Sequence, residues 1–274
     1  MSEYTMFRRR KGNVNPPTDL RIVLLGKTGS GKSSTGNTIL SGCHFTTDDS
    51  MDPVTSSCQK NKANVGGRNI SIIDTPGLFD TSITNEELKS EIEKCVYMSA
   101  PGPHVFLLVI RLDVKFTDEE KNAVKWIHEN FGEDAIKYTI ILFTHADALK
   151  HKSLHEYVDK SKTMQAVVSQ YGGRYHSFNN DNRENRDQVT QLLNMIDEMV
   201  MHHEGKFYTN QMYEEAQKKI KWDNFKKSVF TVALDVGVAA AGAAAGGALG
   251  GAKVVGGAAV AAVGVVKAAK AAYQ

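Results

Sequence analysis

Cysteine is scarce in this chain of 274 residues, which carries only Cys43, Cys58 and Cys95. The three are unpaired in number and lack the spacing of metal ligands, so we expect reduced thiols in a reducing compartment. An amino-terminal apolar stretch of the signal-peptide kind is also missing, so we expect a cytoplasmic protein that faces the cytosol.

A surplus of charge of one sign is missing as well, because 33 Lys and Arg residues are balanced by 31 Asp and Glu residues. The net charge is +2, and no stretch interleaves basic with aromatic residues, so we expect no nucleic-acid partner. One short basic run, residues 8–11, lies in a polar segment of residues 1–17. It is typical of a flexible, solvated tail, and contact with an anionic membrane is the alternative.

Glycine is concentrated at one place, where residues 26–33 read Gly-Lys-Thr-Gly-Ser-Gly-Lys-Ser directly after the apolar run of residues 20–25. A buried strand, a glycine-rich turn and a helix start are the context that a phosphate-binding loop requires. The glycines let backbone N–H groups turn toward phosphate oxygens, and Lys32 would reach the β- and γ-phosphates while Ser33 binds Mg²⁺. We therefore expect a nucleoside triphosphate to contact the whole loop: Gly26, Lys27, Thr28, Gly29, Ser30, Gly31, Lys32, Ser33 and Ser34.

A second motif, Asp-Thr-Pro-Gly at residues 74–77, follows a short apolar strand of residues 69–73. Ligand groups of a doubly wound sheet lie at the carboxyl ends of its strands, which is where this motif falls. Asp74 can hold Mg²⁺, and the backbone N–H of Gly77 can sense the γ-phosphate. The same tetrapeptide is good turn chemistry, but downstream of a phosphate loop the nucleotide interpretation is favoured.

A third apolar strand, residues 138–143, ends in Thr144, His145 and, two residues later, Asp147. The Asp147 carboxylate could accept hydrogen bonds from N1–H and the exocyclic amine of guanine, which adenine cannot offer, so GTP is favoured over ATP. Many GTPases have Asn-Lys where this chain has Thr144 and His145, and an imidazole can stack on a purine where the lysine stem normally lies. Asn179 could close over the base from a later loop, although Asn-Asn is also common in plain loops.

Short apolar strands at residues 20–25, 69–74, 104–110 and 138–144 alternate with helical patterns such as residues 85–99 and 117–131, and no internal repeat is visible. This alternation predicts an α/β fold with a mostly parallel, doubly wound sheet covered on both faces, that is, a P-loop NTPase fold. Residues 206–227 have the pattern of an amphipathic helix. Residues 228–274 are nearly all Ala, Gly and Val.

A longer block, residues 98–120, contains Ser-Ala-Pro-Gly-Pro-His followed by an apolar strand and Phe-Thr-Asp-Glu-Glu. Together with the phosphate loop, Asp-Thr-Pro-Gly-Leu-Phe-Asp and Phe-Asn-Asn, this block resembles the GTPases of immunity-associated proteins (GIMAP), whose G domains are similar to those of septins and the chloroplast Toc receptors. The resemblance spans residues 18–205 and implies a GIMAP-type G domain. It further implies that Thr55, in Val-Thr-Ser-Ser-Cys-Gln, binds Mg²⁺ and the γ-phosphate only in the GTP state, with Thr47 in the same nucleotide-ordered loop. A strand-edge threonine is the alternative for Thr55.

The residue after Asp-Thr-Pro-Gly is Leu78, where many small GTPases place the glutamine that orients the attacking water. Hydrolysis therefore needs a group from elsewhere besides Lys32 and Thr55. The resemblance implies a cation that reaches across a dimer, for which Lys115 and Arg111 are the candidates, with an exposed surface charge as the alternative for both.

Two functions stay open on these grounds. One is a GTP-binding switch with slow, dimerisation-dependent hydrolysis through the nucleotide face, and the other is a GTP-dependent membrane scaffold in which hydrolysis is incidental. Gly242, Gly246 and Gly250 recur at four-residue spacing and would line one face of a helix, and residues 236–252 are just long enough for a marginal membrane span. Residues 229–274 could therefore contact a membrane, fold on themselves as a low-complexity tail, or pack in a homo-oligomer.

Overall fold

The computed structural model describes residues 16–47, 57–78 and 84–218. Thr55, the basic run of residues 8–11 and the Ala/Gly-rich segment 228–274 lie outside these ranges. The chain divides into a unit of Met1–Glu214 and a unit of Glu215–Gln274, and the fold below is that of the first unit. Within the described ranges, no helix combines the length and the apolar character that a membrane span requires.

A six-stranded sheet in the order β2-β3-β1-β4-β5-β6 forms the centre of the first unit. Only β2 is antiparallel to its neighbour; the other pairs are parallel. Parallel strands need crossover connections, and helices supply them here, so both faces of the sheet are covered. The strands are β1 (Asp19–Leu25), β2 (Gln59–Val65), β3 (Arg68–Asp74), β4 (Val105–Arg111), β5 (Thr139–Thr144) and β6 (Tyr175–Ser177).

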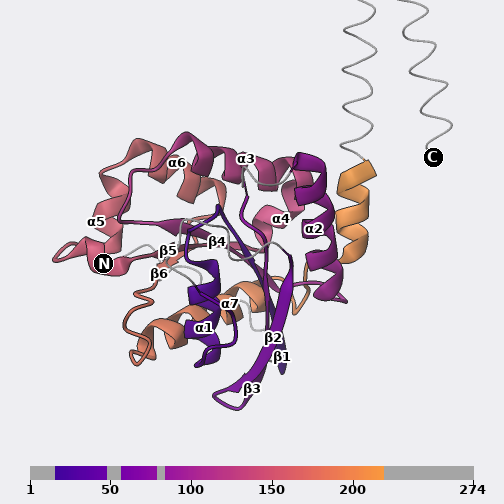
Figure 1. The fold of residues 1–274 in the computed structure, drawn as a ribbon, viewed down its shortest axis with the longest axis horizontal. Helices are drawn as coiled ribbons and strands as arrows, with labels where there is room; N and C mark the ends of the chain where they lie inside the picture. The colour runs from indigo at the N-terminus through magenta and orange to yellow at the C-terminus, as the bar shows by residue number, and fades with distance from the viewer. Residues whose placement is uncertain (1–15, 48–56, 79–83, 219–274) are drawn as a thin grey trace, which may run out of the picture. The chain divides into compact units, whose positions relative to one another are not determined.

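Two helices cover one face of the sheet and the remaining helices cover the other (Figure 1). Helices α1 (Lys32–Leu40) and α7 (Asp187–His202) pack on the face that carries Leu20, Ile22 and Leu24. The opposite face holds α2 (Asn85–Met98), α3 (Asp118–Phe131), α4 (Glu133–Lys137), α5 (Leu154–Asp159) and α6 (Lys162–Gln170), and a 3-10 helix η2 (Ala146–Leu149) follows β5.

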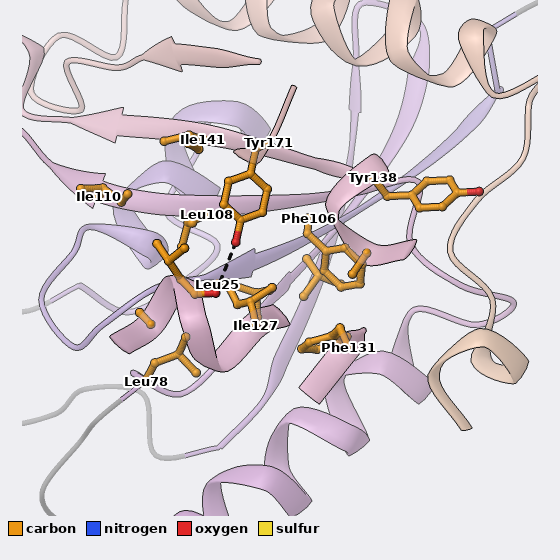
Figure 2. Packing of buried hydrophobic residues seen from close by; sticks show 14 of the residues in the cluster. Leu25, Leu78, Phe106, Leu108, Ile110, Ile127, Phe131, Tyr138, Ile141 and Tyr171 are labelled. Atoms are coloured by element: carbon orange, nitrogen blue, oxygen red, sulfur yellow. Dashed lines mark hydrogen bonds between the residues drawn. The ribbon is translucent and has the colours of Figure 1, made fainter. Parts of the chain in front are cut away.

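The core on the α3 face is built from alternate residues of the central strands and from aromatic side chains (Figure 2). Phe106 of β4 lies 5.0 Å, ring centre to ring centre, from Phe131 at the end of α3. The hydroxyl of Tyr171 is buried and donates to the Val124 carbonyl over 3.4 Å, so its polar atom is paired inside the core. Leu78, the residue in the place of a water-orienting glutamine, belongs to this cluster and is fully buried.

The two long helices of this face begin where local sequence specifies it. Thr84 accepts from the backbone N–H of Glu87, and the Glu87 carboxylate accepts from the Thr84 N–H. Thr117 and Glu120 make the same reciprocal pair at the start of α3. Such capping boxes satisfy two backbone donors that a helix start leaves open.

The expected doubly wound sheet is confirmed, and the four predicted strands agree with β1, β3, β4 and β5 to within one residue. The edge strands β2 and β6 were not predicted, because β2 consists mostly of consecutive polar residues and β6 has only three residues. The expected amphipathic helix begins at Asn210 instead of residue 206, and residues 219–227 lie outside the described ranges. The start is displaced because Tyr208 docks as irregular backbone: its N–H donates to Pro103 and its hydroxyl to Phe131.

The expectation of three reduced thiols is wrong for two of them, because Cys58 and Cys95 form a disulfide. Cys95 is on the buried side of α2 and Cys58 directly precedes β2, so their Cα atoms lie 5.6 Å apart across a separation of 37 residues. That proximity is a property of the tertiary structure and is invisible in cysteine spacing. Cys43 is a free, exposed thiol.

Candidate functional site

The predicted motifs meet at one edge of the sheet because four parallel strands end there. The phosphate loop follows β1, Asp74 ends β3, Arg111 ends β4 and Thr144 ends β5. In an open α/β sheet, this carboxyl edge is where ligands bind.

The phosphate loop is a tight backbone turn that only glycine allows at two positions. Gly26 has φ +150°, and a Cβ there would lie 2.5 Å from the Val109 carbonyl oxygen. Gly31 has φ +87° and directly precedes α1, whose start has no capping side chain. A helix start with uncapped N–H groups beneath a glycine-rich turn is suited to bind an anion.

Lys32 is buried, with only 6% of its surface exposed, although its side chain ends in an ammonium group. Its Nζ donates to the Gly26 and Lys27 carbonyls over 3.1 and 3.0 Å, so the ammonium lies over its own loop. A buried ammonium in this place gives the loop a fixed positive charge.

Ser33 and Asp74 are joined directly, with the Ser33 hydroxyl 2.6 Å from Oδ2 of Asp74. Asp74 is 1% exposed, and its Oδ1 has no hydrogen-bond partner among the described residues. Burial raises the pKa of Asp74, while the Lys32 charge, the Ser33 hydrogen bond and a hydrogen bond from the Thr75 backbone partly oppose that rise. A buried carboxylate oxygen without a donor fits a divalent cation.

The donor set is also right for Mg²⁺ with a phosphate ligand. Within the described ranges, no group of three or more His, Cys, Asp or Glu side chains could hold a metal ion alone. Magnesium keeps several waters and is usually bound by one or two protein oxygens plus substrate phosphates. Ser33 and Asp74 would supply that protein share, and Thr55, the third predicted ligand, lies outside the described residues.

The segment after Asp74 lies directly on the phosphate loop. The Leu78 N–H donates to the Gly26 carbonyl over 3.0 Å. A Cβ on Gly77 would fall 1.9 Å from the Thr28 hydroxyl oxygen, so only glycine fits there. The Leu78 side chain packs in the core (Figure 2) and is fully buried.

On the base side, Thr144 is fully buried, and its hydroxyl donates to the Ser30 carbonyl over 2.8 Å. Thr144 therefore ties the end of β5 to the phosphate loop, and its direct contact with the nucleotide stays a prediction. His145 has φ +56° and is half-buried, and Asp147 is exposed two residues later. The left-handed turn at His145 separates the buried Thr144 from the exposed Asp147.

Asn179 is held by a residue that the sequence did not indicate. Its N–H donates to Oε1 of Gln188 over 2.8 Å, and its carbonyl accepts from Nε2 of the same side chain over 3.1 Å. Its own carboxamide oxygen accepts from the Asp181 N–H, which is the geometry of a local turn. Gln188 is in the first turn of α7 and buried, and nothing in its local sequence marks this contact.

The two base-side loops are also tied to each other and to α1. The Ala146 N–H donates to the Phe178 carbonyl over 3.1 Å. The Asn180 carboxamide oxygen accepts from the Thr38 hydroxyl over 2.8 Å. The loop that carries Asp147 and the loop that carries Asn179 therefore form one connected rim.

The remaining predicted residues are placed as follows. Lys27 forms an ion pair with Glu119 over 3.4 Å, Ser34 is half-buried in α1, and Lys115 is exposed. Thr47 is exposed at the end of the first described stretch. Arg111 lies over the phosphate loop, where its Nη1 donates to the Gly29 carbonyl over 3.3 Å.

A family model described as the AIG1 family matches residues 20–227. Immune-associated nucleotide-binding protein 3 of Arabidopsis thaliana is 33% identical over 209 residues, which cover 73% of this chain and 63% of that protein. GTPase IMAP family member 8 of Homo sapiens is 36% identical over 196 residues, which cover 70% of this chain and 29% of that protein. The chain thus spans less than two thirds of the length of these relatives.

The fold has solved counterparts. The crystal structure of Toc33 from Arabidopsis thaliana in complex with GDP and Mg²⁺ gives a TM-score of 0.55 at 23% identity, with 68% of this chain and 86% of that chain covered. A dimerization-deficient mutant of Toc33 gives a TM-score of 0.56 at 22% identity, with 68% and 85% covered.

Proposed function

The chain belongs to the AIG1 family, and on that premise we propose that it binds GTP with Mg²⁺ and hydrolyses it slowly as a nucleotide-gated switch. The observation that carries this proposal is the contact of Ser33 with Asp74, whose second oxygen is buried and unpaired beside the phosphate loop. The names of the relatives, a nucleotide-binding protein and a GTPase, support the same chemistry, as does the GDP and Mg²⁺ bound to Toc33.

Guanine selectivity rests on the rim after β5 and β6. Asp147 is exposed there, and a carboxylate can accept from both guanine donors. The Gln188 side chain holds the Asn179 backbone through two hydrogen bonds, so the rim is already ordered without a bound base.

Slow turnover follows from Leu78, because a fully buried apolar side chain cannot orient an attacking water. A second copy of the chain, docked through the nucleotide face, would supply the missing charge, and Lys115 is exposed for that role. The dimerization studied in Toc33 supports a G-domain dimer as the arrangement to test.

The alternative is a GTP-dependent membrane scaffold in which hydrolysis is incidental. The observation that favours it is the Ala/Gly-rich composition of residues 229–274, with Gly242, Gly246 and Gly250 at four-residue spacing. Under this alternative, the protein associates with the cytosolic face of a membrane through that segment.

One experiment separates the two functions. Light scattering with GDP and with GMPPNP measures nucleotide-gated assembly of the full chain and of the 1–227 fragment. GTP turnover at several protein concentrations measures whether assembly accelerates hydrolysis. A switch predicts that turnover per molecule rises with concentration in both forms. A scaffold predicts assembly with GMPPNP while GTP turnover per molecule does not change with protein concentration. It also predicts flotation with liposomes only when residues 229–274 are present.

A further inference from the structure

Arg111, the last residue of β4, is held in a two-point fork by Asp113. Its Nε donates to Oδ1 of Asp113 over 2.9 Å and its Nη2 to Oδ2 over 2.5 Å. Parallel bonds of this kind fix the plane of a guanidinium as well as its position. The Arg111 hydrogen bonds hold the pKa of Asp113 below its usual range, so the carboxylate stays ionised at neutral pH.

The third arm of the guanidinium reaches the phosphate loop of the same chain, where Nη1 donates to the Gly29 carbonyl over 3.3 Å. Asp113 therefore does not merely neutralise Arg111. It fixes the plane of the guanidinium, so that Nη1 points toward the Gly29 carbonyl of the phosphate loop.

Asp113 also faces the base side of the site. Its Oδ1 lies 3.7 Å from Nδ1 of His145, the residue that stands in the usual lysine position of the guanine motif. His145 precedes Asp147 by two residues. The Asp113 carboxylate thus lies between the Arg111 guanidinium and the His145 ring, whose Nδ1 is also 3.2 Å from the Thr144 hydroxyl.

We propose that Asp113 is a positioning residue that holds Arg111 on the phosphate loop of its own chain, so that Arg111 acts on nucleotide bound in cis. This inference rests on the proposed function. It assigns Arg111 to the same protomer, because a reach across a dimer would break three hydrogen bonds, and it leaves Lys115 as the cation for a partner site.

The competing explanation is an ordinary surface ion pair, since the Arg111 and Asp113 side chains are each 30% exposed. Exposed ion pairs contribute little to the free energy of unfolding. Measurements of stability therefore cannot distinguish a positioning role of Asp113 from an ordinary surface ion pair. The rate of nucleotide release can distinguish them.

The experiment measures the release rate of a fluorescent GDP analogue from the full chain with Mg²⁺, at nanomolar protein, where subunits are separate. Arg111→Ala and Asp113→Ala should each release the analogue about three- to tenfold faster, and the double variant no faster than either single one. Arg111→Lys should behave like Arg111→Ala, because an ammonium keeps the charge without the fork. Asp134→Asn is the matched control: it removes an exposed carboxylate paired with Lys137, just before the opposite end of β5.

Additive effects of the two Ala substitutions, a normal release rate for Arg111→Lys, or effects that appear only at micromolar protein would each overturn the inference. If Asp113→Ala does not fold, Asp113→Asn replaces it, and an intermediate release rate is expected since its one carboxamide oxygen accepts from one arm. A wild-type chain that binds no guanine nucleotide would instead refute the proposed function, so the two failures are distinguishable.

Discussion

The hydroxyl of Ser33 donates over 2.6 Å to Oδ2 of Asp74, which joins the first turn of α1 to the end of β3 across 41 residues. The other carboxylate oxygen of Asp74 has no partner in the described part of the chain. Together with the Lys32 ammonium over the loop, this pair places a charged, poorly solvated group where a triphosphate and its cation would lie.

Asp74→Asn should nearly abolish the strengthening of nucleotide binding by Mg²⁺, because a neutral carboxamide is a poor ligand for a hard cation. It should also stabilise the nucleotide-free protein at neutral pH. The folded-state pKa of Asp74 is raised, so its stabilising contribution is present below the ordinary value of 3.8 and is lost as pH rises through the raised pKa. Replacement by Asn, whose oxygen still accepts from Ser33, removes that loss.

The measurements are GDP affinity with Mg²⁺ and with EDTA, and thermal unfolding without nucleotide at neutral and acidic pH. Asp134→Asn, which removes an exposed carboxylate paired with Lys137 away from the phosphate loop, is the control. An Asp74→Asn protein that responds to Mg²⁺ like wild type would refute the metal assignment.

Asp147→Ala should weaken GTP binding by about 2–4 kcal/mol, because the guanine N1–H and amine would lose their acceptor. ATP binding should not change. Asp147→Asn should shift preference toward xanthosine triphosphate, whose C2 carbonyl can accept from the new amide. Competition titrations test both, with Asp134→Asn as control, and equal affinities of the wild-type protein for ATP and GTP would contradict the guanine assignment.

His104 should make the folded state sensitive to acid. It is buried and accepts from the Arg21 N–H, and burial lowers its pKa to about 4 from 6.5. Protonation of His104 is less favourable in the folded state, so stability is full above pH 6.5 and is lost as pH falls toward about 4, by about 3 kcal/mol. Urea unfolding across that range measures it.

His104→Asn provides the matched comparison, because its carboxamide oxygen can accept from Arg21 without titrating. The slope of stability between pH 6.5 and about 4 should become shallower in this variant. An unchanged slope would assign the acid sensitivity to other groups.

Only Cys43 should react when the protein is unfolded in denaturant and alkylated without reductant, whereas all three cysteines should react after reduction. Cys58→Ser with Cys95→Ser should lower stability by about 2–4 kcal/mol relative to the oxidised protein, because the bond closes a long loop of the unfolded chain. Mass spectrometry counts the alkylated thiols. Three modified cysteines without reductant would show that the bond does not form.

The sequence by itself determined the parts of the site that are continuous along the chain. Residues 26–33 carry the glycines for their own tight turn, and Thr117 with Glu120 specifies the start of α3, because backbone conformation and capping depend on neighbours a few residues away. Apolar runs likewise indicated the central strands, since a strand buried on both faces has no polar alternation.

Only the tertiary structure decided the contacts that join distant segments. Gln188 supports Asn179, Thr144 supports Ser30, and Cys58 meets Cys95, and none of these pairs has a local signature. Each depends on the strand order, which brings α7, β5 and α2 beside loops far from them in sequence. A side chain's type indicates which bonds it can make, but its partner is set by which backbone groups the packed sheet leaves within about 3 Å of it.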